Sequence, residues 1–162
     1  MNRKARHLAH GALIAALYVA LTHAQNLLLP NSASMAVQFR VSEAMCVLAF
    51  FTPAAIPGLT VGCLLANILC GNIFWDVIFG TLATLLGAIG TRLLRKRPLL
   101  ALLPPILSNT IIVPIVLTYA YGIPGGIPWL MLTVGIGEIL SCGLLGQLLW
   151  GTLDKHKAQL FK

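Results

Sequence analysis

The charged residues of this chain gather at the ends of long apolar runs, and this pattern restricts the fold more than any other feature. Only 9% of the 162 residues are charged and the mean hydropathy is +0.89, whereas ordinary globular domains carry about a quarter charged residues. Apolar runs bounded by charges are typical of transmembrane helices. The sequence therefore predicts an all-α integral membrane protein with a single membrane domain, 1–162, too short to include a soluble catalytic domain.

The net charge of +7 is concentrated in basic clusters that border the apolar runs. Such placement follows the positive-inside rule for cytoplasmic loops and tails. A nucleic-acid-binding protein would instead need a continuous basic stripe, so we expect no nucleic-acid partner. The clusters are Arg3, Lys4 and Arg6; Arg92, Arg95, Lys96 and Arg97; and Lys155, Lys157 and Lys162.

Prolines and turn residues divide the apolar sequence into six segments. Pro53, Pro57 and the stretch CGNIFWD interrupt the region between 41 and 94, because proline breaks helix ladders and Gly-Asn favours a turn. The predicted helices are about 7–28, 41–52, 55–70, 74–94, 99–121 and 128–152. The second and third are shorter than the roughly 20 residues of a full span, so we expect them to tilt or to be partly re-entrant.

The number of crossings follows from the basic clusters. The N-terminal and central clusters share the cytoplasmic side only if an even number of helices lies between them. Four helices satisfy this condition, and two more return the basic C-terminus to the same side. We therefore expect six transmembrane helices in the cell membrane, with both termini cytoplasmic.

Three carboxylates lie within the apolar sequence, where each costs several kcal/mol unless it is paired or hydrated. Glu43 and Asp76 begin predicted helices near the outer surface. Glu138 is about ten residues into the last helix, or roughly 15 Å deep, and Asn109 has a similar depth in the preceding helix. We expect these groups to converge on a binding pocket in the outer half of the bundle.

Each of these acids also has a structural interpretation. Glu43 can pair with Arg40, three residues earlier, or favour a helix N-terminus. Asp76 can mark a helix start, and Glu138 can bond to Asn109 or to a backbone group. The four cysteines show no metal-binding spacing, so we predict buried apolar thiols and no metal site.

The first helix carries Ala12, Ala16 and Ala20 on one face. Small residues at this spacing form a flat strip on which another helix can pack closely. The partner helix belongs either to the same bundle or to another protein.

Five stretches, in this order and spacing, resemble a known family from about Ala12 to Trp150. They are VQFRVSEAM, IPGLTVGCLLANI, DVIFGTLATLLGAIGTRL, LLPPILSNTIIV and LTVGIGEIL. Together they resemble the QueT family, the predicted substrate-binding S-components of energy-coupling factor (ECF) transporters for queuosine or its precursors. The resemblance implies a six-helix S-component bundle that captures queuosine, queuine or another 7-deazaguanine from outside.

The same resemblance implies partners. S-components bind a transmembrane coupling protein through an alanine-rich strip on the first helix, here Ala12, Ala16 and Ala20, and two cytoplasmic ATPases drive uptake. The chain contains no Walker motif, so ATP hydrolysis would belong to those partners and we expect no cofactor in this chain.

The polar residues suit a deazaguanine. A carboxylate can accept the ring N–H and the exocyclic amine together in charge-assisted bonds, and a second carboxylate suits an aminomethyl cation on some precursors. Aromatic faces can stack on the base. Donors for the ring carbonyl are Asn109, Gln38 or Arg40, and the candidate aromatic residues are Phe39, Trp75 and Trp129. We expect Arg40 and Glu43 to pair and to form the outer wall of the site.

Two other transport functions remain open. One is an S-component for another small heterocycle, and the other is a solitary proton-coupled carrier that titrates Glu138. A membrane enzyme is not expected, since the sequence has no nucleophile–base pair and no metal motif.

Overall fold

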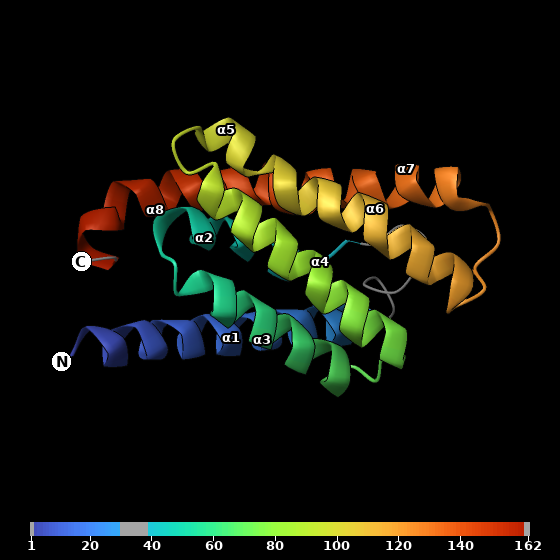
Figure 1. Ribbon diagram of the computed structural model, residues 1–162, viewed down its shortest axis with the longest axis horizontal. Coiled ribbons are helices and arrows are strands. Elements are labelled where there is room, and N and C mark those ends of the chain that lie inside the picture. The colour runs from blue at the N-terminus through green and yellow to red at the C-terminus, as the bar shows by residue number, and fades with distance from the viewer. Residues whose placement is uncertain (1, 30–38, 161–162) are drawn as a thin grey trace.

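The computed structural model describes residues 2–29 and 39–160, and every regular element in these ranges is a helix (Figure 1). The order is α1 (Arg3–Leu28), the 3₁₀ segment η1 (Val41–Val47), α2 (Leu48–Phe51), α3 (Ala55–Leu69), α4 (Phe74–Leu93), α5 (Pro98–Ala101), α6 (Leu103–Tyr119), α7 (Ile127–Glu138), the π-helical segment η2 (Ile139–Leu145) and α8 (Gly146–Leu160). The all-helical prediction is confirmed for these residues.

Four helical stretches in the described part of the chain are long and apolar enough to cross a membrane. They are Arg3–Leu28, Phe74–Leu93, Pro98–Tyr119 and Ile127–Lys157, and two shorter apolar helical stretches cover Val41–Phe51 and Ala55–Leu69. Two helices are longer than the sequence predicted. The first begins at Arg3, where the Asn2 side chain accepts a hydrogen bond from the Lys4 amide. The last continues to Leu160. The chain is a multi-pass membrane protein.

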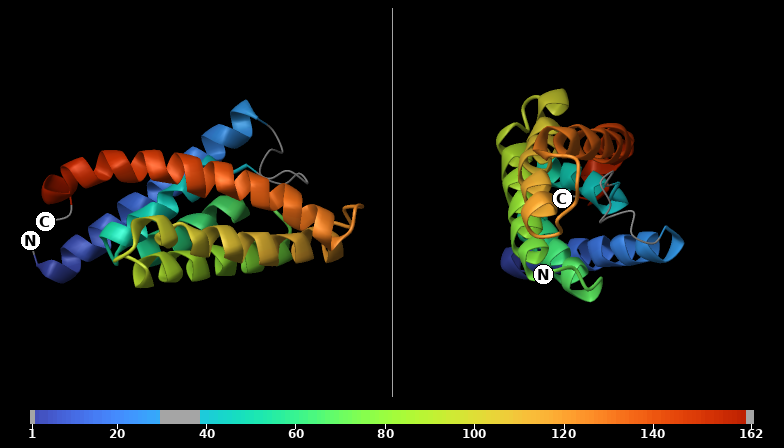
Figure 2. Two further views of the ribbon diagram at one scale, coloured as in Figure 1. Left: turned by 90° about the horizontal axis from the view of Figure 1, so that it is seen from above. Right: turned by 90° about the vertical axis from the view of Figure 1, so that its right-hand side faces the viewer.

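The long helices pack side by side in the order in which they follow one another along the chain. Helix α1 packs on α3, α3 on α4, α4 on α6, and α6 on α7. The short segment η1 lies inside this arrangement and contacts α1, η2 and α8 (Figures 1 and 2). The buried residues that begin the second predicted helix therefore lie at the centre of the bundle.

Glycines at two positions let α1 and α3 approach closely. A Cβ atom on Gly58 of α3 would lie 2.7 Å from the Gly11 carbonyl oxygen of α1, and one on Gly62 would lie 2.8 Å from the Tyr18 Cβ atom. Both distances are too short for a side chain, so α1 and α3 need glycine at these positions. This close packing holds Tyr18 against the centre of the bundle.

Polar side chains face inwards and large apolar ones face outwards. Leu13 and Leu17 of α1 are 59% and 47% exposed, whereas Thr22 and Gln25 of the same helix are buried. Since lipid tails solvate apolar side chains and cannot hydrogen-bond, this distribution suits a bilayer and is the reverse of a soluble domain.

The basic clusters lie at one end of the bundle. The start of α1, the end of α8 and the turn between α4 and α5 are at this end, and the α3–α4 and α6–α7 connections are at the other (Figures 1 and 2). The third cluster includes Lys162, which lies outside the described residues. This arrangement agrees with the even number of crossings that the sequence predicted between the first two clusters.

Candidate functional site

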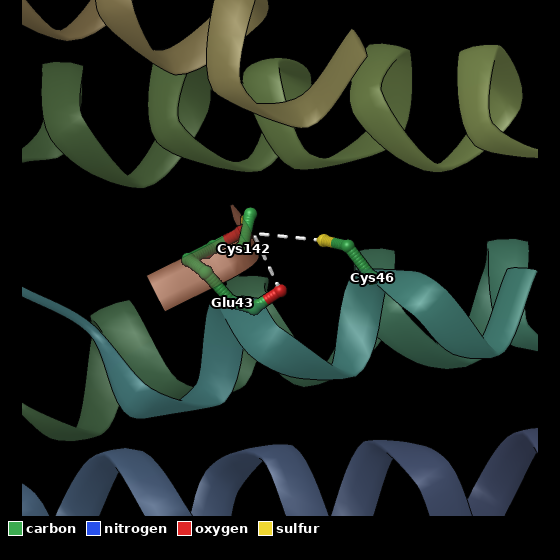
Figure 3. A group of neighbouring side chains, drawn as sticks. All are labelled: Glu43, Cys46 and Cys142. Carbon is green, nitrogen blue, oxygen red and sulfur yellow. Dashed lines mark hydrogen bonds between the residues drawn. The ribbon is translucent and has the colours of Figure 1, made fainter. Parts of the chain in front are cut away.

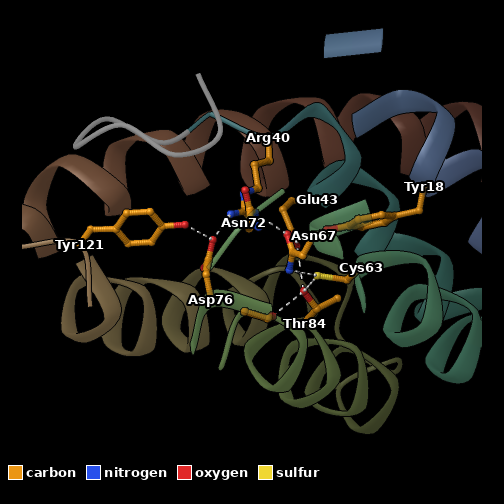
Figure 4. Close-up of polar contacts among 10 residues, drawn as sticks. Tyr18, Arg40, Glu43, Cys63, Asn67, Asn72, Asp76, Thr84 and Tyr121 are labelled. Atoms are coloured by element: carbon orange, nitrogen blue, oxygen red, sulfur yellow. Dashed lines mark hydrogen bonds and ion pairs between the residues drawn. The ribbon is translucent and has the colours of Figure 1, made fainter. Parts of the chain in front are cut away.

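Glu43 lies at the centre of a buried polar cluster and is only 1% exposed. Its Oε1 atom accepts hydrogen bonds from the Tyr18 hydroxyl of α1 and, at 3.4 Å, from Thr84 Oγ1 of α4 (Figure 4). Its Oε2 atom accepts a bond from Cys46 Sγ at 3.3 Å. Three different elements thus supply neutral donors to one carboxylate, which is how a buried acid remains tolerable.

Asp76 is the acid that pairs with Arg40. Their Oδ2 and Nη2 atoms are 3.6 Å apart, and both side chains are buried. The Tyr121 hydroxyl, from the α6–α7 connection, donates to the same Asp76 oxygen at 3.2 Å (Figure 4). The predicted pairing of Arg40 with Glu43 is therefore wrong. Arg40 precedes η1 in extended backbone, with φ −122° and ψ 106°, so the three-residue spacing does not place the two side chains on one helical face.

Glu138 is 3% exposed and belongs to the same cluster. Its Oε2 atom accepts a hydrogen bond from Cys142 Sγ at 3.4 Å, and the Asn109 side chain of α6 is another hydrogen-bonding neighbour. The Cys142 thiol also lies 3.3 Å from the Glu43 carbonyl oxygen. Glu138 and Asn109 therefore converge as predicted, and Cys142 connects Glu138 to η1.

The backbone changes its helical type next to Glu138. The α-helix α7 ends at this residue, and the π-helical segment Ile139–Leu145 begins at the next one. Segments of π-helix are rare and occur frequently at functional sites. Here the segment contains Ser141 and Cys142, and Ser141 Oγ accepts a hydrogen bond of 3.2 Å from the Arg40 amide.

A chain of polar side chains leads from Glu43 toward the α3–α4 turn. Thr84 Oγ1 lies 3.3 Å from Cys63 Sγ, Asn67 Nδ2 lies 3.5 Å from the same sulfur, and Asn72 Nδ2 donates to Asn67 Oδ1 at 3.0 Å (Figure 4). Cys63 and Asn67 are buried and Asn72 is half-buried. Polar groups thus connect the central carboxylate with the end of the bundle that holds the α3–α4 connection.

The predicted aromatic residues are not part of this cluster. Trp75 is 53% exposed and stacks on Phe79, with ring centroids 6.0 Å apart, and Trp129 is 55% exposed. Trp75 neighbours Asp76 in the sequence, but successive helical residues point in different directions. Phe39 is half-buried, and its carbonyl oxygen accepts a hydrogen bond from Gln25 Nε2. Gln38 lies outside the described residues.

Sequence reasoning missed several members of the cluster. Tyr18 gave no signal because hydroxyl residues are ordinary in membrane helices. The cysteines were predicted to be buried apolar side chains, and Cys46, Cys63 and Cys142 are buried. Their thiols nevertheless contact polar groups of the cluster (Figures 3 and 4). Only the folded chain brings them together.

The alanine strip of α1 lies on the surface. Ala12, Ala16 and Ala20 are exposed, whereas the face of α1 that packs on α3 contains Gly11, Ala15 and Tyr18. The three alanines therefore lie outside the buried face that packs on α3.

The charge balance of the cluster determines which ligands it can hold. It contains three carboxylates and one guanidinium, and the guanidinium is paired with Asp76. Glu43 and Glu138 receive hydrogen bonds only from neutral groups among their described contacts. A ligand with several N–H donors or a positive charge can replace these neutral donors, whereas an anionic ligand would meet like charge.

Comparison with known proteins shows which family the chain belongs to. The family model described as QueT transporter matches residues 8–155. A curated protein from Lactococcus lactis subsp. cremoris (strain MG1363), named queuosine precursor transporter QueT, is 42% identical over 78 residues, which cover 46% of this chain and 42% of that protein. The match thus covers less than half of the relative's length. No solved structure matches the chain.

Proposed function

Because the chain belongs to the QueT transporter family, we propose that it is the substrate-binding subunit of an importer that takes up a queuosine precursor. The ligand class comes from the name of the curated relative. The proposed ligand is queuine or a related 7-deazaguanine, and the proposed site is the cluster around Glu43, Asp76 and Glu138.

The observation that carries this proposal is the burial of three carboxylates in one cluster. Glu43, Asp76 and Glu138 are 1%, 2% and 3% exposed. Burying a charge is costly in a membrane protein, so such residues usually mark a functional site. A 7-deazaguanine presents a ring N–H and an exocyclic amine side by side, which one carboxylate can accept together. Glu43 or Glu138 fits this role, because neutral donors now occupy the positions that the ligand would take.

The Arg40–Asp76 pair offers contacts to either a cationic or a neutral precursor. Asp76 also accepts a hydrogen bond from Tyr121, which lies on the connection between α6 and α7. A ligand that carries an aminomethyl cation would compete with Arg40 for Asp76, whereas a neutral base would receive a donor from Arg40 at its ring carbonyl. Entry from the end with the α3–α4 and α6–α7 connections suits both ligands.

We also propose that the chain works with partner proteins. In this account Ala12, Ala16 and Ala20 bind a transmembrane coupling protein, and two cytoplasmic ATPases bound to that protein drive uptake. The exposure of the strip supports this, since a helix can approach alanine more closely than it can approach leucine. Six crossings, with the basic end of the bundle cytoplasmic, complete the proposed topology.

A solitary proton-coupled carrier is the second candidate, because Glu138 and Glu43 are both in contact with Cys142. Uptake into liposomes that contain only this chain and a proton gradient separates the two functions. A subunit of an ATP-driven importer gives no such uptake, whereas a carrier concentrates the ligand.

Binding to purified protein tests the ligand. We expect queuine or an aminomethyl 7-deazaguanine to raise the thermal midpoint in a concentration-dependent way, and riboflavin and biotin to leave it unchanged. Stabilisation by riboflavin or biotin alone would mean that the site holds another heterocycle.

A further inference from the structure

Two thiols and a carboxylate from separate parts of the chain meet inside the bundle. One ligand atom from each of Glu43, Cys46 and Cys142 lies within 4.8 Å of the other two, and all three residues are buried (Figure 3). Glu43 and Cys46 are one turn apart on η1, and Cys142 comes from η2. The cysteine spacing in the sequence gives no sign of this cluster, because Cys46 and Cys142 are far apart in the chain.

We propose that Glu43, Cys46 and Cys142 form a binding site for a thiophilic divalent metal ion, with Zn²⁺ as the natural occupant. Thiolate and carboxylate together are ordinary ligands of Zn²⁺.

The sulfur–oxygen distance between Cys46 and Glu43 is close to the one that a zinc site requires. Zinc binds sulfur at about 2.3 Å and carboxylate oxygen at about 2.0 Å, so a tetrahedron places the sulfur and oxygen ligands about 3.5 Å apart. The Cys46 sulfur is 3.3 Å from Glu43 Oε2, and each of the three ligand atoms lies within 4.8 Å of the other two. Binding draws the three ligand atoms together around the ion, and it releases the two thiol protons.

The site has consequences for the proposed transport function, and this step rests on that function. A metal ion would occupy Glu43, one of the two carboxylates proposed to accept the N–H groups of the ligand. Zinc and the precursor therefore exclude each other, and zinc inhibits capture of the ligand.

Cadmium is the probe for the site itself, because sulfur-to-cadmium charge transfer absorbs in the ultraviolet. The purified full-length chain with reduced thiols, in metal-free buffer, is titrated with Cd²⁺. We expect a saturable absorption band that Zn²⁺ displaces. Cys46→Ser and Cys142→Ser should each weaken cadmium binding at least about tenfold. Even the loss of a residue that only hydrogen-bonds to a metal ligand typically lowers metal affinity by about this factor.

Cys70→Ser is the matched control, because Cys70 is a half-buried thiol at the end of α3. This variant should keep the band. Absence of a saturable band in the wild-type chain, or an equal loss in all three serine variants, would overturn the proposal. If one serine variant does not fold, the other decides by the same comparison with Cys70→Ser. A negative result leaves the proposed ligand untouched, because binding of the precursor is measured without metal.

Discussion

Arg40 and Asp76 form a buried ion pair between the start of η1 and the first turn of α4, with 3.6 Å between Nη2 and Oδ2. The pair joins the short central segment to α4, which packs on both α3 and α6. It also places a positive charge beside the acids, which limits the net negative charge of the site.

Removal of the Asp76 charge should destabilise the protein strongly. Asp76→Asn leaves Arg40 without its carboxylate, and breaking one side of a buried pair costs about 3–5 kcal/mol. The matched control is Asp154→Asn, which removes the exposed pair between Asp154 and Lys157 and should cost at most about 1 kcal/mol. Thermal unfolding in detergent compares the two, and equal midpoints would contradict a structural role for the buried pair.

Loss of the Tyr18 hydroxyl should affect the centre of the bundle. Tyr18→Phe removes a donor to Glu43 and leaves a buried carboxylate oxygen with one partner fewer, at a cost of about 1–3 kcal/mol. Tyr119→Phe is the control, because Tyr119 is 79% exposed. The free energy of unfolding of both variants is compared with that of the wild type. A neutral Tyr18→Phe would show that this hydrogen bond contributes nothing to stability.

A methyl group on Gly58 should push α1 away from α3. Its Cβ atom would lie 2.7 Å from the Gly11 carbonyl oxygen, and overpacking of this kind costs about 1–3 kcal/mol. Gly151→Ala, in α8, is the control, because a Cβ atom there meets nothing within 4 Å. This change should be neutral or stabilising by up to about 1 kcal/mol, since alanine favours a helix. Similar midpoints for both variants would refute the close packing of α1 on α3.

A bulky residue on the alanine strip should separate assembly from ligand binding. Ala16 is exposed, so Ala16→Trp should leave the fold and the ligand affinity unchanged while it blocks the approach of a partner helix. Co-purification with the coupling protein and the ATPases measures assembly, and ligand affinity of the isolated chain is the control. Normal assembly of Ala16→Trp would remove the strip from the interface.

The sequence predicted the helices and the convergence of the acids better than it predicted their partners. Glu138 and Asn109 could be brought together from their depth in neighbouring helices, and Glu43 and Asp76 from their places at helix starts. The Arg40–Glu43 pair was wrong, because spacing indicates a shared face only within a helix and Arg40 lies in extended backbone.

Other features depend on tertiary contacts that a single sequence does not contain. No residue pattern in the sequence predicts the π-helical segment after Glu138. This segment carries Cys142, which contacts both η1 and Glu138. Exposure of the alanine strip follows from the choice of the Gly11–Tyr18 face for packing on α3. The spacing of the alanines alone is compatible with packing of either face of α1 on α3.

Ligand affinity of Glu138→Gln tests the central claim most directly. The substitution keeps the size of the side chain and replaces one acceptor oxygen with a donor, which would face the N–H groups of a 7-deazaguanine. Affinity for the precursor, measured by calorimetry, should fall by at least about 2 kcal/mol, or about thirtyfold, whereas Asp154→Asn should bind like the wild type. A dissociation constant for Glu138→Gln about equal to that of the wild type would remove Glu138 from the ligand site and contradict the account.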